Sequence, residues 1–286
     1  MTAEAAEGSR LVHEIEEARA AISGRATLRP EVGIVLGTGL GRFAESTARP
    51  TVLPYGDIPH FPRASVQGHA GELILGELGG RPAAVMNGRV HYYEGYSMGQ
   101  VTFPVRVLRA LGVHTLIVTN AAGGMNPIYR EGDIAMVVDH INLMGDNPLL
   151  GRNEDRLGPR FPDMSEPYDR SLQALAREVA MEEGILLREG VLAGVAGPNL
   201  ETRAEYRFLR WAGADLVSMS LVPEAIVAAH SGLRLLAFAV VTDLCLPDAL
   251  GPVDVPKILA NAAAAEPHLT RLVTRIVHQL PSGGAS

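Results

Sequence analysis

The chain has 286 residues, of which 47% are hydrophobic and 20% charged, so it can bury a sizeable core and global disorder is excluded. Its formal net charge of −7 argues against sequence-independent binding of nucleic acid, which requires a basic face. Cys245 is the only cysteine, which excludes an internal disulfide and a cysteine-rich zinc site and fits a reducing cytoplasm. The sequence shows no signal-peptide pattern and no apolar run long enough for a bilayer, so we expect a cytoplasmic protein without membrane contact.

The predicted elements alternate between strands and helices along the chain. Apolar periodicity and capping residues predict helices over residues 11–23, 98–112, 171–183, 203–213, 223–232 and 256–280. Short apolar runs predict strands over residues 31–37, 72–78, 81–88, 113–124, 132–145, 188–197, 214–220 and 233–243. This alternation predicts an α/β fold with a sheet covered on both faces, and the lack of a long linker predicts one domain over residues 1–286. The polar, proline-rich stretch 148–167 is too long for a plain connection and predicts a functional or interface loop.

The first strand ends in a glycine-rich turn, "GTGLGR", at residues 37–42. A dinucleotide fingerprint would require a third glycine where Arg42 stands, which counts against a nucleotide-dependent oxidoreductase. Gly37 and Gly39 would still let the backbone approach an oxyanion, and Thr38 would add a hydroxyl donor. A tight turn without a ligand explains the same residues equally well.

Other strand ends carry further candidates, because ligands of α/β sheets bind beyond the carboxyl ends of strands. Arg89 and His91 alternate within "NGRVHYYEGY", so on an extended segment both face one side and could bind phosphate oxygens. Either residue alone could equally be an ordinary surface side chain. The stretch "TNAAGG" at 119–124 offers a bare backbone for a flat ligand or for close packing. Ser220 ends a short strand, whereas Glu224 fits a structural role at the start of a helix.

Taken in order, these stretches resemble the trimeric, low-molecular-mass purine nucleoside phosphorylases, whose superfamily includes the methylthioadenosine phosphorylases. The resemblance covers about residues 32–280 and is carried by "GTGLG", "GHAGE", "NGRVHYYEGY", "TNAAGGMNP", "GPRFPDMSEPY", "GPNLETRAEYRFLRWAGADLVSMS" and "VPE". It implies a single α/β domain with a mixed, partly barrel-like β-sheet flanked by helices, assembled as a homotrimer. It also implies reversible phosphorolysis of purine ribo- and deoxyribonucleosides to the free base and (deoxy)ribose 1-phosphate. Inorganic phosphate is then a co-substrate, and neither metal nor organic cofactor is expected.

The resemblance also assigns roles to individual residues. Phosphate would be held by Thr38, His69, Arg89, His91, Ser220 and the amide of Ala121. The nucleoside would be bound by Tyr93 and Met219 at the ribose, by Ala121, Ala122, Gly123, Leu200 and Val217 along the base, by Glu201 at N1, and by Phe161 of a neighbouring subunit. Leu200 stands where the family usually has an aromatic residue, so ring stacking would be lost there.

Two positions depart from the 6-oxopurine branch of this family. Asp243 stands where those enzymes have asparagine and where methylthioadenosine enzymes have aspartate, and Val255 replaces a histidine that meets the ribose 5′-hydroxyl. A carboxylic acid at position 243 could protonate N7 of the departing base, so Asp243 joins His91 and Glu201 as a catalytic candidate. The departures suggest an alternative, an S-methyl-5′-thioadenosine or adenosine phosphorylase. A nucleoside-binding protein without catalysis and a hydrolase are further alternatives, which phosphate dependence would separate.

Overall fold

The computed structural model describes residues 3–63 and 70–281. Its helices are α1 (Ala3–Ser23), α2 (Met98–Ala110), α3 (Arg170–Glu182), α4 (Arg203–Trp211), α5 (Val222–His230) and α6 (Val255–Gln279), with 3₁₀ turns η1 (Gly41–Ser46), η2 (Tyr55–Asp57) and η3 (Tyr92–Glu94). Its strands are β1 (Val32–Val35), β2 (Ala48–Pro54), β3 (Glu72–Leu78), β4 (Arg81–Asn87), β5 (Thr115–Gly124), β6 (Ile134–Leu143), β7 (Leu187–Val195), β8 (Leu216–Ser218) and β9 (Arg234–Leu244).

The strands form one mixed sheet in the order β2-β3-β4-β1-β5-β8-β7-β6-β9. An additional parallel pairing of β5 with β9 closes the strands from β5 to β9 into a barrel, while β2, β3, β4 and β1 extend from it as an open sheet. Strand β5 therefore belongs to both the barrel and the open sheet, and its carboxyl end lies where the two meet. The expected α/β fold with a partly barrel-like mixed sheet is confirmed.

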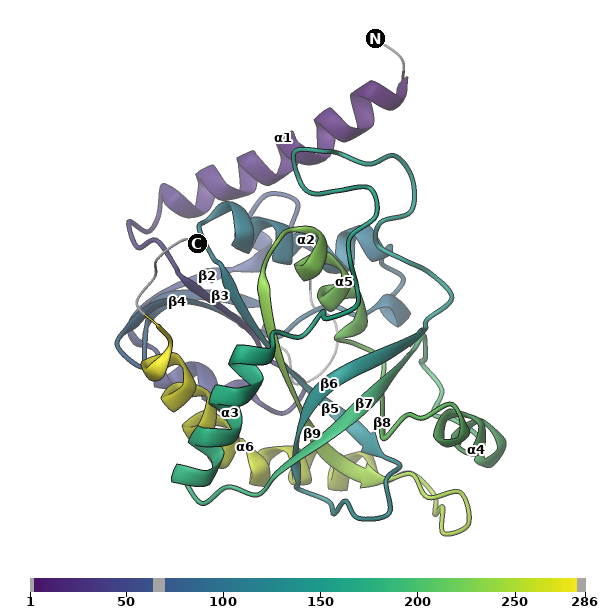
Figure 1. Ribbon diagram of the computed structural model, residues 1–286. Coiled ribbons are helices and arrows are strands. Elements are labelled where there is room, and N and C mark those ends of the chain that lie inside the picture. The colour runs from purple at the N-terminus through teal and green to yellow at the C-terminus, as the bar shows by residue number, and fades with distance from the viewer. Residues whose placement is uncertain (1–2, 64–69, 282–286) are drawn as a thin grey trace.

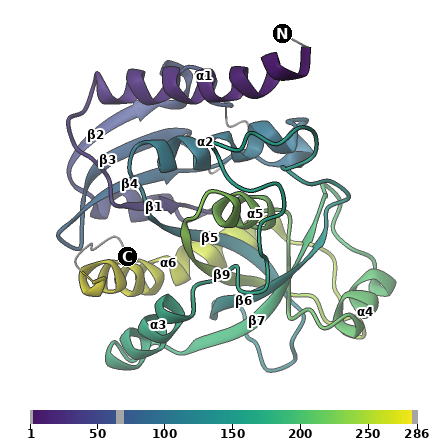
Figure 2. The same ribbon diagram turned by 45° about the horizontal axis from the view of Figure 1, so that its top comes forward.

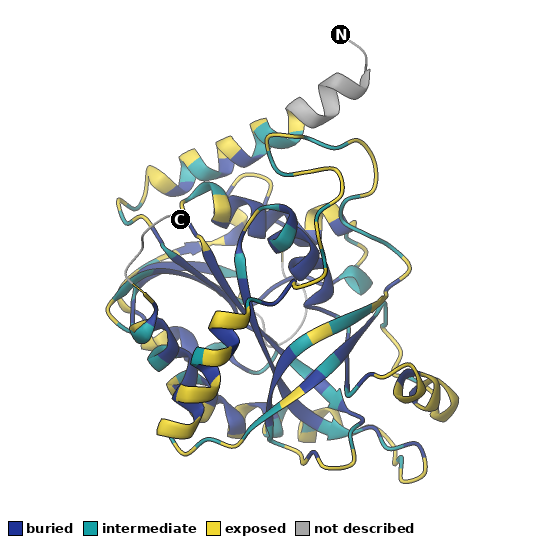
Figure 3. Ribbon diagram, viewed as in Figure 1, coloured by how far each residue is buried: buried dark blue, intermediate teal, exposed yellow. Residues whose placement is uncertain are grey.

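Helices cover the sheet on two sides (Figures 1 and 2). Helices α1, α2 and α5 pack on one side around a buried cluster that includes Ile15, Phe103 and Ile226. Helices α3 and α6 pack on the other side around a cluster that includes Val179 and Leu272. Helix α4 stands at the edge of the barrel, and Figure 3 shows it largely exposed, in contrast to the buried central strands.

Local chemistry accounts for the helix boundaries close to the site. Helix α4 begins at a capping box, in which the Thr202 hydroxyl accepts from the Glu205 amide at 3.2 Å and Glu205 accepts from the Thr202 amide at 2.7 Å. Helix α6 begins at Asp254, whose carboxylate accepts from the Lys257 amide at 3.0 Å. The first cap fixes the start of α4 directly after the pocket residue Glu201, and the second fixes the start of α6 just before the pocket residue Ile258.

The elements predicted from the sequence agree closely with the structure, with one omission. Strand β2 was not predicted, because it contains Pro50 and Pro54 and pairs on one side only, with β3. The segment 148–167 contains no helix or strand, in agreement with the prediction of a long loop.

Candidate active site

One pocket collects residues from strand ends that are far apart in sequence. It opens where the carboxyl ends of β1, β5, β8 and β9 meet the segment after β4 and the starts of α4 and α6. Its lining consists of Gly37, Thr38, Arg89, His91, Tyr93, Asn120, Ala121, Ala122, Gly123, Val195, Leu200, Glu201, Tyr206, Val217, Ser218, Met219, Ser220, Thr242, Asp243, Cys245 and Ile258.

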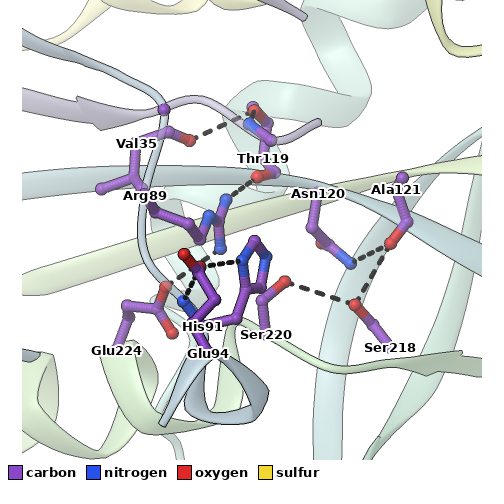
Figure 4. Close-up of polar contacts among 12 residues, drawn as sticks. Val35, Arg89, His91, Glu94, Thr119, Asn120, Ala121, Ser218, Ser220 and Glu224 are labelled. Atoms are coloured by element: carbon purple, nitrogen blue, oxygen red, sulfur yellow. Dashed lines mark hydrogen bonds and ion pairs between the residues drawn. The ribbon is translucent and has the colours of Figure 1, made fainter. Parts of the chain in front are cut away.

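Arg89 is fixed at one end of the pocket by fully buried contacts (Figure 4). Its Nη1 donates to Glu224 Oε1 at 3.0 Å, and its Nη2 donates to the carbonyl of Thr119. The backbone beside it is also held, since the Tyr55 hydroxyl donates to the Gly88 carbonyl at 2.7 Å. A buried cation held in this way supplies positive charge for an oxyanion where water screens it little.

His91 lies beside Arg89 and is oriented by Glu94 (Figure 4). Glu94 Oε1 accepts from the His91 amide at 2.7 Å and lies 3.2 Å from Nδ1. The carboxylate therefore holds the proton on Nδ1, which makes Nε2 the acceptor nitrogen of the ring. Burial and the nearby Arg89 lower the pKa of His91, while Glu94 acts in the opposite direction. The ring of Tyr93 stacks on that of His91, with centroids 4.8 Å apart.

Glycine at position 37 allows β1 and β5 to meet at the pocket. A Cβ there would lie 2.6 Å from Asn120 Cα and 2.9 Å from the Thr119 carbonyl, so no other residue fits. The Gly37 amide donates to Thr119 Oγ1 at 3.2 Å, and Thr119 donates to the Val35 carbonyl at 3.2 Å. This arrangement places Thr38 at the pocket wall.

Ser220 reaches the same end of the pocket from β8. Ser218 Oγ donates to the Ala121 carbonyl at 3.1 Å and lies 3.3 Å from Ser220 Oγ (Figure 4). Because the Ser218 proton points to a carbonyl, the Ser220 hydroxyl is the donor between the two serines. Its single proton can rotate away from Ser218 and donate to a ligand instead. The next residue, Leu221, is fully buried at φ 76°, a strained conformation that the surrounding core must enforce.

Two carboxylates face the other end of the pocket. Glu201 precedes α4, and burial is the main cause that raises the pKa of its carboxyl, with a smaller contribution from Asp243. Asp243 Oδ1 accepts from Thr242 Oγ1 at 2.8 Å, and Oδ2 accepts from Cys245 Sγ at 3.2 Å. Strand β5 runs from Thr119, whose carbonyl accepts from Arg89, to Gly123, which pairs with Asp243, so the bare backbone of residues 121–123 lies between the two ends. The pocket thus has a cationic end, a flat middle and an acidic end.

The structure brings most of the predicted site residues together. The pocket is lined by Thr38, Arg89, His91, Tyr93, Ala121, Ala122, Gly123, Leu200, Glu201, Val217, Met219, Ser220 and Asp243. His69 lies outside the described residues. Phe161 lines a separate hollow and is 86% exposed, so it plays no part in the pocket of its own chain. Val255 is 55% exposed and does not line the pocket, whereas Ile258, one turn further along α6, does.

Several pocket residues were not identified from the sequence. Glu94 was overlooked and Glu224 was interpreted as structural, although both hold the phosphate candidates from behind the pocket. Asn120 and Cys245 were noted but given no role in the site, and Ser218, Tyr206 and Ile258 were not considered. A capping position three residues after His91 was the available signal for Glu94. Within residues 3–63 and 70–281, no group of three or more His, Cys, Asp and Glu side chains is arranged to hold a metal ion. The helices of those same ranges include none with the length and apolar character to cross a bilayer.

Comparison with known proteins places this chain in a family. Residues 31–278 match the model of the phosphorylase superfamily. The chain belongs to this superfamily. Among its relatives, purine nucleoside phosphorylase 1 of Bacillus subtilis (strain 168) is 47% identical over 265 residues, which cover 93% of this chain and 98% of the relative. Purine nucleoside phosphorylase of Mus musculus is 46% identical over 260 residues, covering 88% and 90%. The family resemblance seen in the sequence is therefore confirmed at the level of purine nucleoside phosphorylases.

Solved structures of the phosphorylase superfamily show the same fold. Schistosoma purine nucleoside phosphorylase in complex with hypoxanthine superposes with a TM-score of 0.90 at 39% identity, covering 95% of this chain and 98% of that one. The Schistosoma mansoni enzyme in complex with inosine gives a TM-score of 0.91 at 38% identity, with the same coverage. The alternative of a methylthioadenosine or adenosine phosphorylase is not favoured by these relatives. The placement of Val255 outside the pocket also removes one of the two observations on which that alternative rested.

Proposed function

We propose that this protein catalyses the reversible phosphorolysis of purine ribo- and deoxyribonucleosides, giving the free base and (deoxy)ribose 1-phosphate. The observation that carries the proposal is a single pocket with a buried arginine at one end and two carboxylates at the other. An oxyanion, a sugar and a purine fit these three zones in that order. The named relatives, which are purine nucleoside phosphorylases, support the same reaction.

Phosphate would bind at the cationic end. We assign its oxygens to the guanidinium of Arg89, the hydroxyls of Thr38 and Ser220, and the amide of Ala121, with His69 as a further donor. His91 Nε2 would accept a hydrogen bond from the hydroxyl of monohydrogen phosphate, because Glu94 keeps the other ring nitrogen protonated. The dianion then lies next to the ribose, where it stabilises positive charge at C1′.

The nucleoside would fill the rest of the pocket. The ribose would contact Tyr93 and Met219, the base would lie on residues 121–123 between Leu200 and Val217, and Glu201 would accept the N1 proton of a 6-oxopurine. Phe161 projects from the body and would reach the pocket of a neighbouring subunit, which fits assembly as a homotrimer. Within this scheme Val255 lies outside the pocket, and Ile258 supplies the apolar contact from α6.

The chemical step needs no group beyond phosphate and these side chains. A phosphate oxygen forms a bond to C1′ while the bond from C1′ to N9 breaks, through an oxocarbenium-like ribose. The electron pair of that bond passes to the purine, which must take up a proton. We assign this proton transfer to Asp243, acting on N7 as a general acid.

Phosphate-dependent release of the base is the test of the reaction. Hypoxanthine should form from inosine only when inorganic phosphate is present, with one ribose 1-phosphate per base. Release without phosphate would indicate a hydrolase, and binding without release would indicate a nucleoside-binding protein. Activity that survives exhaustive dialysis against a chelator would support the absence of a metal or organic cofactor. Sedimentation of the purified chain would check the proposed trimer, and cell fractionation the cytoplasmic location.

A leaving group that needs no proton tests the role of Asp243. Asp243→Ala should lower kcat for inosine by about 100-fold, the contribution typical of a general acid. 7-Methylguanosine carries a positive charge on its base and leaves without protonation, so its kcat should change little in the same variant. Equal losses on both nucleosides would contradict general acid catalysis by Asp243 and leave the phosphorolysis itself unaffected.

A further inference from the structure

The long loop 148–167 contains no helix or strand, yet it carries the exposed Phe161 that the proposed function directs to a neighbouring subunit. Holding a loop of this length in one arrangement costs conformational entropy, so specific contacts must offset that cost. Three of its apolar side chains, Leu149, Leu157 and Met164, pack partly buried against the core on the side of α1, α2 and α5. The turn before Phe161 has a second anchor, which is polar.

This polar anchor is His230, the last residue of α5. Its ring is buried, with Nδ1 3.3 Å from Arg106 Nη1 of α2 and Nε2 3.2 Å from Asn153 Oδ1 of the loop. Because a guanidinium can only donate, Nδ1 is the acceptor and the proton of the neutral ring is on Nε2, from which it is donated to Asn153. One tautomer therefore satisfies both contacts of the ring.

Asn153 extends the connection from His230 to the turn. Its Oδ1 accepts from the ring, and its Nδ2 donates one hydrogen to Asp155 Oδ1 at 2.8 Å and the other to the Gly158 carbonyl at 2.9 Å. The backbone of Gly158 also lies directly on the end of α5, since a Cβ there would be 1.9 Å from the His230 carbonyl oxygen. The turn 153–158 is thus fixed to α5 by side-chain hydrogen bonds and by backbone contact.

Phe161 follows this fixed turn within three residues. Between them, Arg160 Nη1 donates to the Leu149 carbonyl at 2.9 Å, and its guanidinium carbon lies 5.7 Å from the centre of the Phe161 ring. On the far side Met164 packs against the core. The segment that presents Phe161 is therefore held at both ends, by Gly158 and by Met164.

We propose that Arg106, His230 and Asn153 are positioning residues that fix the direction of Phe161 and thereby set the nucleoside affinity of a neighbouring subunit. The proposal rests on the proposed function, which gives Phe161 its place in that neighbouring pocket. None of the three residues lines the pocket of its own chain. A side chain that is presented rigidly loses less conformational entropy on binding, so the contacts behind Phe161 should act on KM for the nucleoside.

Asn153→Ala is the variant that tests the proposal most directly. It releases the turn while His230 remains in place as the acceptor for the buried Arg106. Amide hydrogen exchange within residues 153–161 should become about tenfold faster, the value of one net hydrogen bond, and KM for inosine should rise by a similar factor. KM for phosphate and kcat should stay within about twofold of wild type, because the phosphate contacts lie elsewhere.

Two further variants serve as controls. Arg156→Ala breaks an ion pair with Glu154 in the same loop, and this pair is exposed and does not reach α5, so hydrogen exchange and KM should remain as in wild type. His230→Gln should also behave as wild type, because glutamine can accept from Arg106 and donate to Asn153. Equal exchange rates in Asn153→Ala and Arg156→Ala would overturn the proposal and leave the apolar anchors as the only hold on the turn.

A double-mutant cycle with Phe161 separates positioning from general stability. Phe161→Ala alone should raise KM for inosine, and Asn153→Ala should then add nothing, because the relay acts through the ring that has been removed. Additive effects would show that Asn153 acts independently of Phe161. An unchanged KM in Phe161→Ala would show that the ring does not reach a nucleoside. Either result would refute the proposal.

Failure of the proposed function would look different. If the wild-type protein released no base with phosphate, the phosphorolysis would be refuted. Calorimetric titration of hypoxanthine into wild type, Asn153→Ala and Phe161→Ala would then decide the positioning role without catalysis. Similar losses of affinity in the two variants would support it, and wild-type affinity in Asn153→Ala would refute it.

Discussion

Arg89 and Glu224 form an ion pair at the cationic end of the pocket, with Nη1 3.0 Å from Oε1 and each side chain 3% exposed. Arg89 follows β4 and Glu224 lies in the first turn of α5, 135 residues later. Their pairing fixes the guanidinium before an oxyanion binds, so binding costs little further conformational entropy of the Arg89 side chain.

Loss of the Glu224 charge should weaken both stability and phosphate binding. Glu224→Gln keeps the shape of the side chain but leaves Arg89 as a buried cation without its counter-ion, at a cost of about 3–5 kcal/mol in the free energy of unfolding. KM for phosphate should rise, whereas KM for inosine should change less. Urea denaturation and steady-state kinetics measure both effects. Glu131→Gln is the control, since it breaks the exposed pair with Lys257 and should cost less than about 1 kcal/mol.

A methyl group at position 123 should disturb base recognition specifically. Gly123→Ala places a Cβ 2.5 Å from Cys245 Sγ and 3.1 Å from Val217 Cγ1, so the thiol and the Asp243 carboxylate must move. KM for inosine should rise by about tenfold or more, as expected for misplacement of a binding group, with KM for phosphate unchanged. Gly99→Ala in α2 meets only Ser97 Oγ at 3.9 Å and should leave both constants as they are. Equal effects of the two alanines would contradict the prediction.

The loop after β9 should loosen when Arg203 is shortened. Arg203 Nη1 donates to the Pro247 carbonyl at 2.6 Å and Nη2 donates to the Leu250 carbonyl at 2.7 Å, so one guanidinium ties α4 to this loop. Arg203→Ala should speed proteolytic cleavage within residues 245–254 and raise KM for inosine several-fold. Arg210→Ala, on the same helix, serves as the comparison. Unchanged cleavage in Arg203→Ala would show that the loop is held by other contacts.

His230 should make the protein less stable in mild acid. Its Nδ1 lies 3.3 Å from Arg106 Nη1 and its Nε2 lies 3.2 Å from Asn153 Oδ1, and burial with the adjacent Arg106 lowers its pKa to about 4. An unfolded chain protonates this histidine below about pH 6.5, whereas the folded chain does not. The free energy of unfolding should therefore fall as pH drops from about 6.5 to 4, by about 1.4 kcal/mol per unit at most, and level off below.

The variant His230→Gln isolates this contribution. Glutamine can still accept from Arg106 and donate to Asn153, but it does not titrate. The difference in free energy of unfolding between wild type and variant should therefore change with pH across the window from 6.5 to 4 and stay constant above it. Denaturation curves at several pH values measure this difference, and parallel curves for the two proteins would rule out His230 as the source.

The order of elements could be read from the sequence, but the closure of the sheet could not. Alternating apolar runs located β5 and β9 because buried strands have a clear pattern. Their pairing, which closes the barrel, depends on register between strands more than a hundred residues apart, and one chain contains no signal for it. Strand β2 was missed because prolines mask an edge strand.

The pocket was predictable where motifs are local and unpredictable where contacts are distant. Arg89, His91 and Ser220 followed from strand ends and from the family resemblance. Glu224 was interpreted as a helix-end residue because its partner is remote in sequence, although the structure pairs it with Arg89. Tyr206 and Cys245 gave no signal at all, since a buried tyrosine at helical spacing and a single cysteine both look like ordinary core residues.

The dual membership of β5 has a consequence for synthesis of the chain. Its parallel partner β9 and the pocket residues Asp243, Cys245 and Ile258 all lie in the last fifth of the chain and are translated late. A nascent polypeptide that stops before β9 has no complete binding site, so nucleoside cannot rescue it. Bound nucleoside would therefore stabilise only completed chains against unfolding. The concentration of nucleoside in the cell would then affect how long the folded enzyme survives and would not affect its folding during translation.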